Sequence, residues 1–292
     1  MITRSLGPGA VEVGVVGYGG WPLSDTDPRI TEGDAVAVLH AALDGGATLI
    51  DTADAYCRHE GEAGHNERLI ARALASWNGP REEVVVATKG GFVRPEGRWE
   101  HDASPEHLRA ACDRSLQALG VDRIDLYQLH SPDPAVPLPE SVGMLAELAA
   151  EGKVRWIGLS NVSLDQIREA REQVAVVSVQ NRLNPFFREA VDDGVVDYCA
   201  SEGLGFLAYS PVGGGRLNQK LPDHPILGPI AERHGVSPHA VALAWVIARG
   251  PTVIVIPAAR KRAHVADSQA AAGLELSPDE LAAIDAAEFP VT

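Results

Sequence analysis

The chain has 292 residues, 45% of them hydrophobic, and a formal net charge of −15 at pH 7. This acidity excludes nucleic acid as the main partner, because a phosphate backbone attracts basic surfaces, and an anionic ligand would need a local basic cluster. No apolar run approaches the roughly 18 residues of a membrane span, so we expect no membrane partner.

Short apolar runs alternate with longer amphipathic stretches and predict eight strands and eight helices. The predicted strands are Val13–Tyr18, Thr48–Asp51, Val84–Thr88, Asp125–Leu129, Trp156–Leu159, Val176–Gln180, Gly205–Ala208 and Val253–Ile256. The predicted helices are Glu32–Leu43, Asn66–Ser76, Pro105–Leu119, Pro139–Glu151, Leu164–Glu172, Asp192–Glu202, Pro238–Arg249 and Lys261–Ala272. Several helices begin at a cap signal, such as Ser104 followed by Pro105.

Strict alternation of strand and helix predicts a parallel sheet with helical crossovers. A doubly wound sheet and a closed barrel share this pattern. Eight units in 292 residues, without a shift in composition, favour the barrel. We therefore predict an α/β fold, a single (β/α)₈ barrel domain spanning residues 1–292. The segment from Ser5 to Val13 predicts an N-terminal β-hairpin, and residues 277–289 predict an extra C-terminal helix.

Four ionisable residues lie at or just after three successive predicted strands. Asp51 ends one strand and Tyr56 follows five residues later, Lys89 directly follows the next strand, and His130 directly follows the one after. In a barrel of this kind the carboxyl ends of the strands carry the chemistry, so these side chains should meet at one rim. Each residue alone is more typical of a salt bridge or a structural hydrogen bond, but structural needs do not readily explain the set of four.

The four residue types fit the reduction of a carbonyl group. A nicotinamide supplies hydride, and the protein supplies a proton and stabilises the developing oxyanion. A phenol holds its proton at neutral pH, with an ordinary pKa of about 10, and a nearby ammonium makes it a better acid. We therefore expect Tyr56 to be the general acid, Lys89 and Asp51 to tune it, and His130 to orient the carbonyl oxygen.

At this point the sequence resembles the aldo-keto reductase superfamily over nearly its whole length. The resemblance rests on seven motifs in the family's order: Leu49 to Tyr56, Thr88-Lys89, Leu126 to His130, Ile157 to Asn161, Gln180-Asn181, Ala208 to Pro211, and Ile256-Pro257. It implies an NADPH-dependent reductase of aldehydes or ketones. It also implies that NADPH, in preference to NADH, lies extended across the barrel mouth without a Rossmann domain.

The resemblance also implies which residues bind. Ser160, Asn161 and Gln180 match residues that hold the nicotinamide carboxamide, and Tyr209 matches the aromatic residue that stacks on its ring. The implied cofactor-binding set is Gly20, Trp21, Asp51, Ser160, Asn161, Gln180, Tyr209, Ser210, Pro211, Val212, Gly213, Leu217, Ala259, Arg260, His264, Asp267 and Ser268. The implied substrate contacts are Trp21, Tyr56 and His130, with Phe92 and Trp99 as weaker candidates.

A basic cluster, Arg260-Lys261-Arg262, lies where the family binds the adenosine 2′-phosphate. A guanidinium suits phosphate through its planar fork of donors, although a solvated surface patch is the structural alternative. Ser268 replaces an expected Asn, and Ala259 replaces a common Ser or Lys. Cys57 stands where glycine often follows the catalytic tyrosine, and a polar insert runs from Cys57 to Ala63. Ser268 and Ala259 bear on the choice of NADPH over NADH, while Cys57 and the insert leave the local loop shape and the substrate preference open.

Other classes fit less well. The sequence has no complete GxGxxG, no HxH or HExxH metal motif, and one clear carboxylate at a strand end where a glycosidase needs two. Its three cysteines are scattered, so we expect free thiols and no metal site. We also expect a cytoplasmic protein that is a monomer or a weak homo-oligomer. A non-catalytic NADPH-sensing subunit of the same fold is the alternative function. Sugar, pyridoxal-like and xenobiotic carbonyls all stay open as substrates.

Overall fold

A computed structural model describes residues 2–26 and 28–292. Within them, eight parallel strands follow one another around a sheet in the order β3, β4, β5, β8, β9, β10, β11, β12. Their bounds are Tyr18–Gly19 (β3), Leu49–Asp51 (β4), Val85–Gly90 (β5), Ile124–Leu129 (β8), Val154–Ser160 (β9), Val176–Arg182 (β10), Gly205–Tyr209 (β11) and Val253–Val255 (β12). A bridge between Val16 and Val255 joins the two edges. The predicted (β/α)₈ barrel is therefore confirmed.

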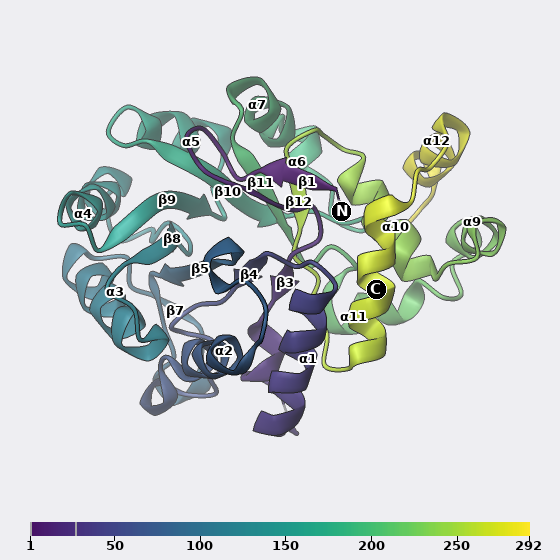
Figure 1. Cartoon of the computed structure of the whole chain (residues 1–292). Coiled ribbons are helices and arrows are strands. Elements are labelled where there is room, and N and C mark those ends of the chain that lie inside the picture. The colour runs from purple at the N-terminus through teal and green to yellow at the C-terminus, as the bar shows by residue number, and fades with distance from the viewer. Residues whose placement is uncertain (1, 27) are drawn as a thin grey trace.

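Helices surround the strands (Figure 1). Their bounds are Glu32–Asp44 (α1), His65–Ser76 (α2), Pro105–Leu119 (α3), Leu138–Ala150 (α4), Leu164–Arg171 (α5), Glu189–Asp192 (α6), Val195–Glu202 (α7), Gly214–Leu217 (α8), Leu227–His234 (α9), Pro238–Ile247 (α10), Arg262–Ala270 (α11) and Pro278–Ala286 (α12). The cap signals account for the starts. Ser104 caps α3 by accepting a hydrogen bond from the His107 backbone, and Ser277 forms a full capping box at α12.

The N-terminal hairpin closes the base of the barrel. Strands β1 (Thr3–Ser5) and β2 (Glu12–Gly14) pair antiparallel and cross one end of the barrel in Figure 1. Leu6 and Val13 are fully buried in a cluster with residues from the amino-terminal parts of the barrel strands, including Leu49 and Val177. The backbone amide of Gly205, the first residue of β11, donates to the Leu6 carbonyl at 3.1 Å. The hairpin is thus the floor of the barrel.

Most predicted elements agree with the structure to within one or two residues, and the larger differences have physical causes. The apolar run Val13–Tyr18 is divided, because its start pairs within the hairpin and only Tyr18–Gly19 joins the barrel sheet. The helix predicted over Asp192–Glu202 is two short helices, α6 and α7, separated at Gly194, whose φ of 74° is left-handed. The structure also contains α8, α9 and a small antiparallel pair, β6 (Phe92–Val93) and β7 (Glu100–His101), which the sequence pattern did not predict.

Candidate active site

The four predicted catalytic residues come from three neighbouring strand ends. Asp51 is the last residue of β4, Lys89 lies near the end of β5, and His130 directly follows β8. Tyr56 lies on the β4–α2 loop. A tight turn folds this loop back, and in that turn the Tyr56 amide donates a hydrogen bond to the Ala53 carbonyl at 3.1 Å. The fold therefore turns the phenol back over the strand from which its loop begins.

The Lys89 ammonium lies at the centre of the group. It donates to the Asp51 carboxylate at 2.7 Å, to the Thr52 carbonyl at 2.8 Å, and to the phenol oxygen of Tyr56 at 2.9 Å. All three donors of the ammonium are thereby used. On its other side the Asp51 carboxylate accepts a hydrogen bond from the Gln180 amide at 2.7 Å. The predicted phenol, ammonium and carboxylate thus share one connected network.

Burial shapes the proton affinities of this network. Lys89 is fully buried, and burial lowers the pKa of its ammonium while the Asp51 charge opposes that shift. The pKa of the Tyr56 phenol lies well above its ordinary value, because burial and the Asp51 carboxylate disfavour the phenolate. The expected lowering of this pKa by Lys89 is not seen in the resting site. The phenol therefore holds its proton firmly at neutral pH.

The imidazole of His130 completes the group. Its ring centroid lies 5.7 Å from that of Tyr56 in an edge-on arrangement. Burial, followed by the Lys89 charge, lowers the pKa of His130 well below its ordinary value, so the ring is neutral at pH 7. Its Nδ1 atom is buried and has no hydrogen-bond partner in the described part of the chain. A neutral ring of this kind can orient a carbonyl oxygen by a hydrogen bond without carrying charge.

A cavity of about 830 Å³ opens above the group. Most of the residues predicted to bind cofactor or substrate line it. They are Trp21, Asp51, Tyr56, His130, Ser160, Asn161, Gln180, Tyr209, Ser210, Pro211, Val212, Ala259, Arg260 and His264. Lys89 is not among them, since it lies fully buried and acts on the cavity only through Asp51 and Tyr56.

Five predicted cofactor residues do not line this cavity: Gly20, Gly213, Leu217, Asp267 and Ser268. Gly213 packs toward the ring of Phe186, and Leu217 is buried. The Asp267 carboxylate accepts a hydrogen bond from Ser237 at 2.7 Å, so it takes part in helix packing. These five residues occupy positions of the family pattern in the sequence, but they do not line the cavity.

The cavity also has walls that the sequence analysis did not predict, formed by Pro22, Thr26, Ile30, Asn218, Ile256 and Ala258. Thr26 and Ile30 lie in the loop between β3 and α1. In a barrel every such loop faces the catalytic end, so this loop could have been considered from the strand pattern alone. Trp99 and Phe92, the weaker substrate candidates, both line the cavity.

Two residues at the cavity hold unusual backbone conformations. Asn161 has a φ of 56° and Ser210 a φ of 48°, in the left-handed region that is costly for residues other than glycine. Asn161 is held there by its side chain, which donates to the His130 carbonyl at 2.9 Å and accepts from the Tyr209 phenol at 2.8 Å. These contacts tie the predicted nicotinamide residues to His130.

The basic residues lie at the edge of the same cavity. Arg260, Lys261 and His264 line it. The Arg260 guanidinium donates to the Pro28 carbonyl at 2.7 Å, while its buried Nε atom has no hydrogen-bond partner among the described residues. An anionic group bound at this edge would lie near the Arg260 guanidinium, whose Nε–H is not used by another hydrogen bond among the described residues.

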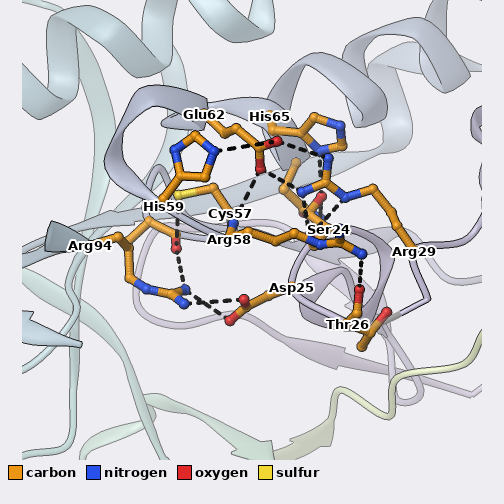
Figure 2. A network of polar contacts seen from close by, with 12 residues as sticks. Ser24, Asp25, Thr26, Arg29, Cys57, Arg58, His59, Glu62, His65 and Arg94 are labelled. Atoms are coloured by element: carbon orange, nitrogen blue, oxygen red, sulfur yellow. Dashed lines mark hydrogen bonds and ion pairs between the residues drawn. The ribbon is translucent and has the colours of Figure 1, made fainter. Parts of the chain in front are cut away.

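The insert from Cys57 to Ala63 is bound to the β3–α1 loop by Arg58 and Glu62, while its residues 59–61 are exposed (Figure 2). Glu62 pairs with Arg29 at 2.5 Å, and the Arg58 guanidinium donates to the Thr26 carbonyl at 2.6 Å. Cys57 is buried, and burial raises the pKa of its thiol to about 11. The insert therefore supports a wall of the cavity, and its cysteine is an unreactive thiol at neutral pH.

None of the helices in residues 2–26 and 28–292 combines the length and apolar character needed to cross a membrane.

The family model described as the aldo/keto reductase family matches residues 15–288. A probable aldo-keto reductase of Glycine max is 34% identical over 306 residues, covering 94% of this chain and 86% of that protein. An uncharacterised oxidoreductase of Schizosaccharomyces pombe is 34% identical over 286 residues, covering 98% of this chain and 87% of that protein. A solved aldo-keto reductase from Klebsiella pneumoniae in complex with NADPH is 30% identical, with a TM-score of 0.81 and coverage of 98% of this chain and 95% of that one.

Proposed function

Because this chain belongs to the aldo/keto reductase family, an oxidoreductase family, we propose that it reduces an aldehyde or ketone to the alcohol with NADPH, using Tyr56 as the general acid. The observation that carries the proposal is the position of the Lys89 ammonium, 2.7 Å from the Asp51 carboxylate and 2.9 Å from the Tyr56 phenol, beneath the 830 Å³ cavity. An ion pair that served stability alone would not require a phenol between it and the cavity, as Tyr56 is here.

The residues around the cavity fit an extended dinucleotide. Polar side chains that suit an amide (Ser160, Asn161 and Gln180) lie at the catalytic end, next to the Tyr209 ring. Arg260, with its unused buried donor, lies at the other proposed end. The NADPH complex of the Klebsiella pneumoniae relative supports the same choice of cofactor. NADPH, when bound, supplies a hydride to the carbonyl carbon.

The chain's own residues then handle the proton. The substrate oxygen lies between Tyr56 and His130, and the neutral imidazole orients it. Tyr56 gives its phenolic proton to that oxygen as negative charge develops there. The Lys89 ammonium, 2.9 Å away, stabilises the phenolate that results. Water from the open mouth returns a proton to Tyr56, so the carbonyl gains one hydride and one proton overall.

The direct test is to mix the protein with NADPH and a panel of aldehydes and ketones, and to follow the absorbance of the reduced nicotinamide. We expect turnover with at least one aldehyde. Tight binding of NADPH without turnover on any member of the panel would contradict the proposal and favour the non-catalytic NADPH-sensing role.

A further inference from the structure

Two tryptophan side chains stand at the cavity with large exposed surfaces. Trp21, in the short 3₁₀ helix after β3, is 41% exposed, and Trp99, beside strand β7, is 40% exposed. Both line the cavity. An indole left exposed at a cavity mouth needs another force to fix its orientation, because core packing does not restrict its rotation.

The carboxylate of Asp25 fixes the first indole. The indole N–H of Trp21 donates to Asp25 at 3.0 Å. The same carboxylate accepts two parallel hydrogen bonds from the guanidinium of Arg94, at 2.8 and 3.1 Å. Figure 2 shows the Arg94 and Asp25 side chains directed at each other from separate segments of the chain. Bidentate pairs of this type fix the relative orientation as well as the distance of their partners.

The guanidinium of Arg94 fixes the second indole. Its central carbon lies 4.1 Å from the centroid of the Trp99 ring. Trp99 in turn meets Tyr56 and His130 edge-on, with centroid distances of 6.4 and 5.9 Å. A continuous chain of contacts thus runs from Trp21 through Asp25 and Arg94 to Trp99, and ends at the two catalytic rings.

Arg94 has no donor left for a ligand. Its five N–H groups are used by the Asp25 carboxylate and by the carbonyl oxygens of Ala55 and Gly97. Its side chain is 5% exposed. A substrate carboxylate would therefore find this cation already neutralised, which makes Arg94 a positioning residue and not an anion-binding one.

We propose that the Asp25–Arg94 ion pair sets substrate specificity, by holding Trp21 and Trp99 as two walls of a slot that accepts a carbonyl compound with a flat, uncharged body. The inference rests on the proposed function and deepens it. Trp21, Phe92 and Trp99 supply the apolar faces of the slot. Among the described cavity residues, the charged side chains are Asp51, paired with Lys89, and Arg260 and Lys261 of the proposed cofactor end.

The same loop offers a matched control. The Arg29–Glu62 pair also ties the β3–α1 loop to the Cys57–Ala63 insert, at 2.5 Å. Neither residue lines the cavity or contacts an indole in the described structure. Glu62→Gln therefore weakens the anchoring of the loop without disturbing the contacts of Trp21 and Trp99, and it separates a general effect of loop support from a specific effect of indole position.

The experiment compares kcat/KM for 4-methylbenzaldehyde, 4-carboxybenzaldehyde and propanal at saturating NADPH. In the wild type we expect 4-methylbenzaldehyde to exceed each of the others by about tenfold or more, the usual scale of pocket discrimination. In Asp25→Asn and Arg94→Lys we expect the ratio of 4-methylbenzaldehyde to propanal to fall about tenfold, mainly through KM. The Kd for NADPH should change less than about twofold in both variants, and Glu62→Gln should keep the wild-type ratio.

An unchanged ratio in both variants would overturn the inference, even if kcat/KM falls equally for both aldehydes, because a merely structural role predicts such an equal loss. A wild type that prefers propanal or the carboxylated aldehyde would overturn it without any substitution. If the wild type oxidises no NADPH with any carbonyl compound, the proposed function itself fails, and that result is distinct from turnover with an unmoved ratio.

Discussion

The ammonium nitrogen of Lys89 lies 2.9 Å from the phenol oxygen of Tyr56, inside a site where both side chains are buried. This contact stabilises a phenolate only when one forms, because burial and Asp51 keep the pKa of the free phenol high. In the proposed mechanism the ammonium would act on the charge that develops during proton transfer and not on the resting phenol, which is the condition for lowering a barrier.

Replacing Tyr56 with Phe should remove the proton donor while keeping the ring. We expect kcat to fall by about 10²–10⁴-fold, the usual contribution of a general acid, with the Kd for NADPH nearly unchanged. Steady-state kinetics and a fluorescence titration with NADPH measure the two effects. Tyr198→Phe, on the outer helix α7, is the control. A Tyr56→Phe variant that retains most of its kcat would remove Tyr56 from the mechanism.

Lys89→Met should cost both rate and stability. It leaves the Asp51 carboxylate buried without its cation, and breaking a buried ion pair on one side typically costs about 3–5 kcal/mol. We expect the free energy of unfolding, measured by urea denaturation, to fall by that order, and kcat to fall with it. The double variant Asp51→Asn with Lys89→Met should regain part of the stability but none of the rate. A rate that recovered together with stability would mean that Lys89 is structural only.

The buried carboxyl of Asp54 should make stability depend on pH. Burial, reinforced by Glu67, raises the pKa of Asp54 from 3.8 to about 7. Between these values the folded chain holds a proton that the unfolded chain has lost, so stability falls as pH rises from about 4 to about 7. Asp54→Asn, whose amide imitates the neutral acid, should flatten this dependence.

Urea denaturation across that pH range measures the effect. We expect the wild type to lose on the order of 2–4 kcal/mol over this range, and Asp54→Asn to lose clearly less. Asp165→Asn is the control, because that side chain is 94% exposed. Parallel pH curves for the wild type and Asp54→Asn would contradict the assignment.

Arg260→Ala should weaken NADPH more than NADH. If the guanidinium binds the 2′-phosphate, its loss removes a charge-assisted hydrogen bond that only NADPH makes, worth about tenfold to a hundredfold in Kd. Titration of the variant with both nucleotides measures the difference. Arg168→Ala, on helix α5 away from the cavity residues, is the matched loss of one positive charge. Equal weakening of both nucleotides would argue against a 2′-phosphate contact.

The sequence predicted most of this molecule where the signals are local. Ser104 and Pro105 placed the start of α3 correctly, and the strand-end rule brought Asp51, Lys89 and His130 to one rim. Helix α9 was missed because Gly228 and Pro229 suggest a break. Pro229 is tolerated there because it lies in the first turn, where its missing N–H has no intrahelical partner.

Contacts between distant segments could not be predicted in this way. Asp25 and Arg94 are 69 residues apart, and Arg260 and Pro28 are 232 apart. No periodicity or cap couples such pairs, and only the closure of the barrel brings their loops together. The conformation of Asn161, with its left-handed φ, is equally invisible in a single sequence, since its supports are the Tyr209 phenol and the His130 carbonyl.

The floor of the barrel offers a prediction about stability alone. A Cβ atom at Gly205 would lie 2.3 Å from the Leu6 carbonyl oxygen, so Gly205→Ala must displace the hairpin. We expect a loss of about 1–3 kcal/mol in the free energy of unfolding, with kcat at low temperature unchanged. Gly33→Ala, in helix α1 with open space around the new methyl group, should instead be neutral or slightly stabilising. A fall in kcat for Gly205→Ala below its melting range would show that floor and rim are coupled.

The hairpin beneath the strands gives the molecule two ends that can change separately. Substitutions around Leu6 and Val13 alter how firmly the cylinder holds together, while those around Trp21 and Trp99 alter what it accepts. Because neither Leu6 nor Val13 lines the cavity, and neither tryptophan belongs to the buried cluster around Leu6, their free-energy effects should add. Substitutions that raise the free energy of unfolding at the hairpin end could therefore be made first. They would offset destabilising changes made later around the cavity.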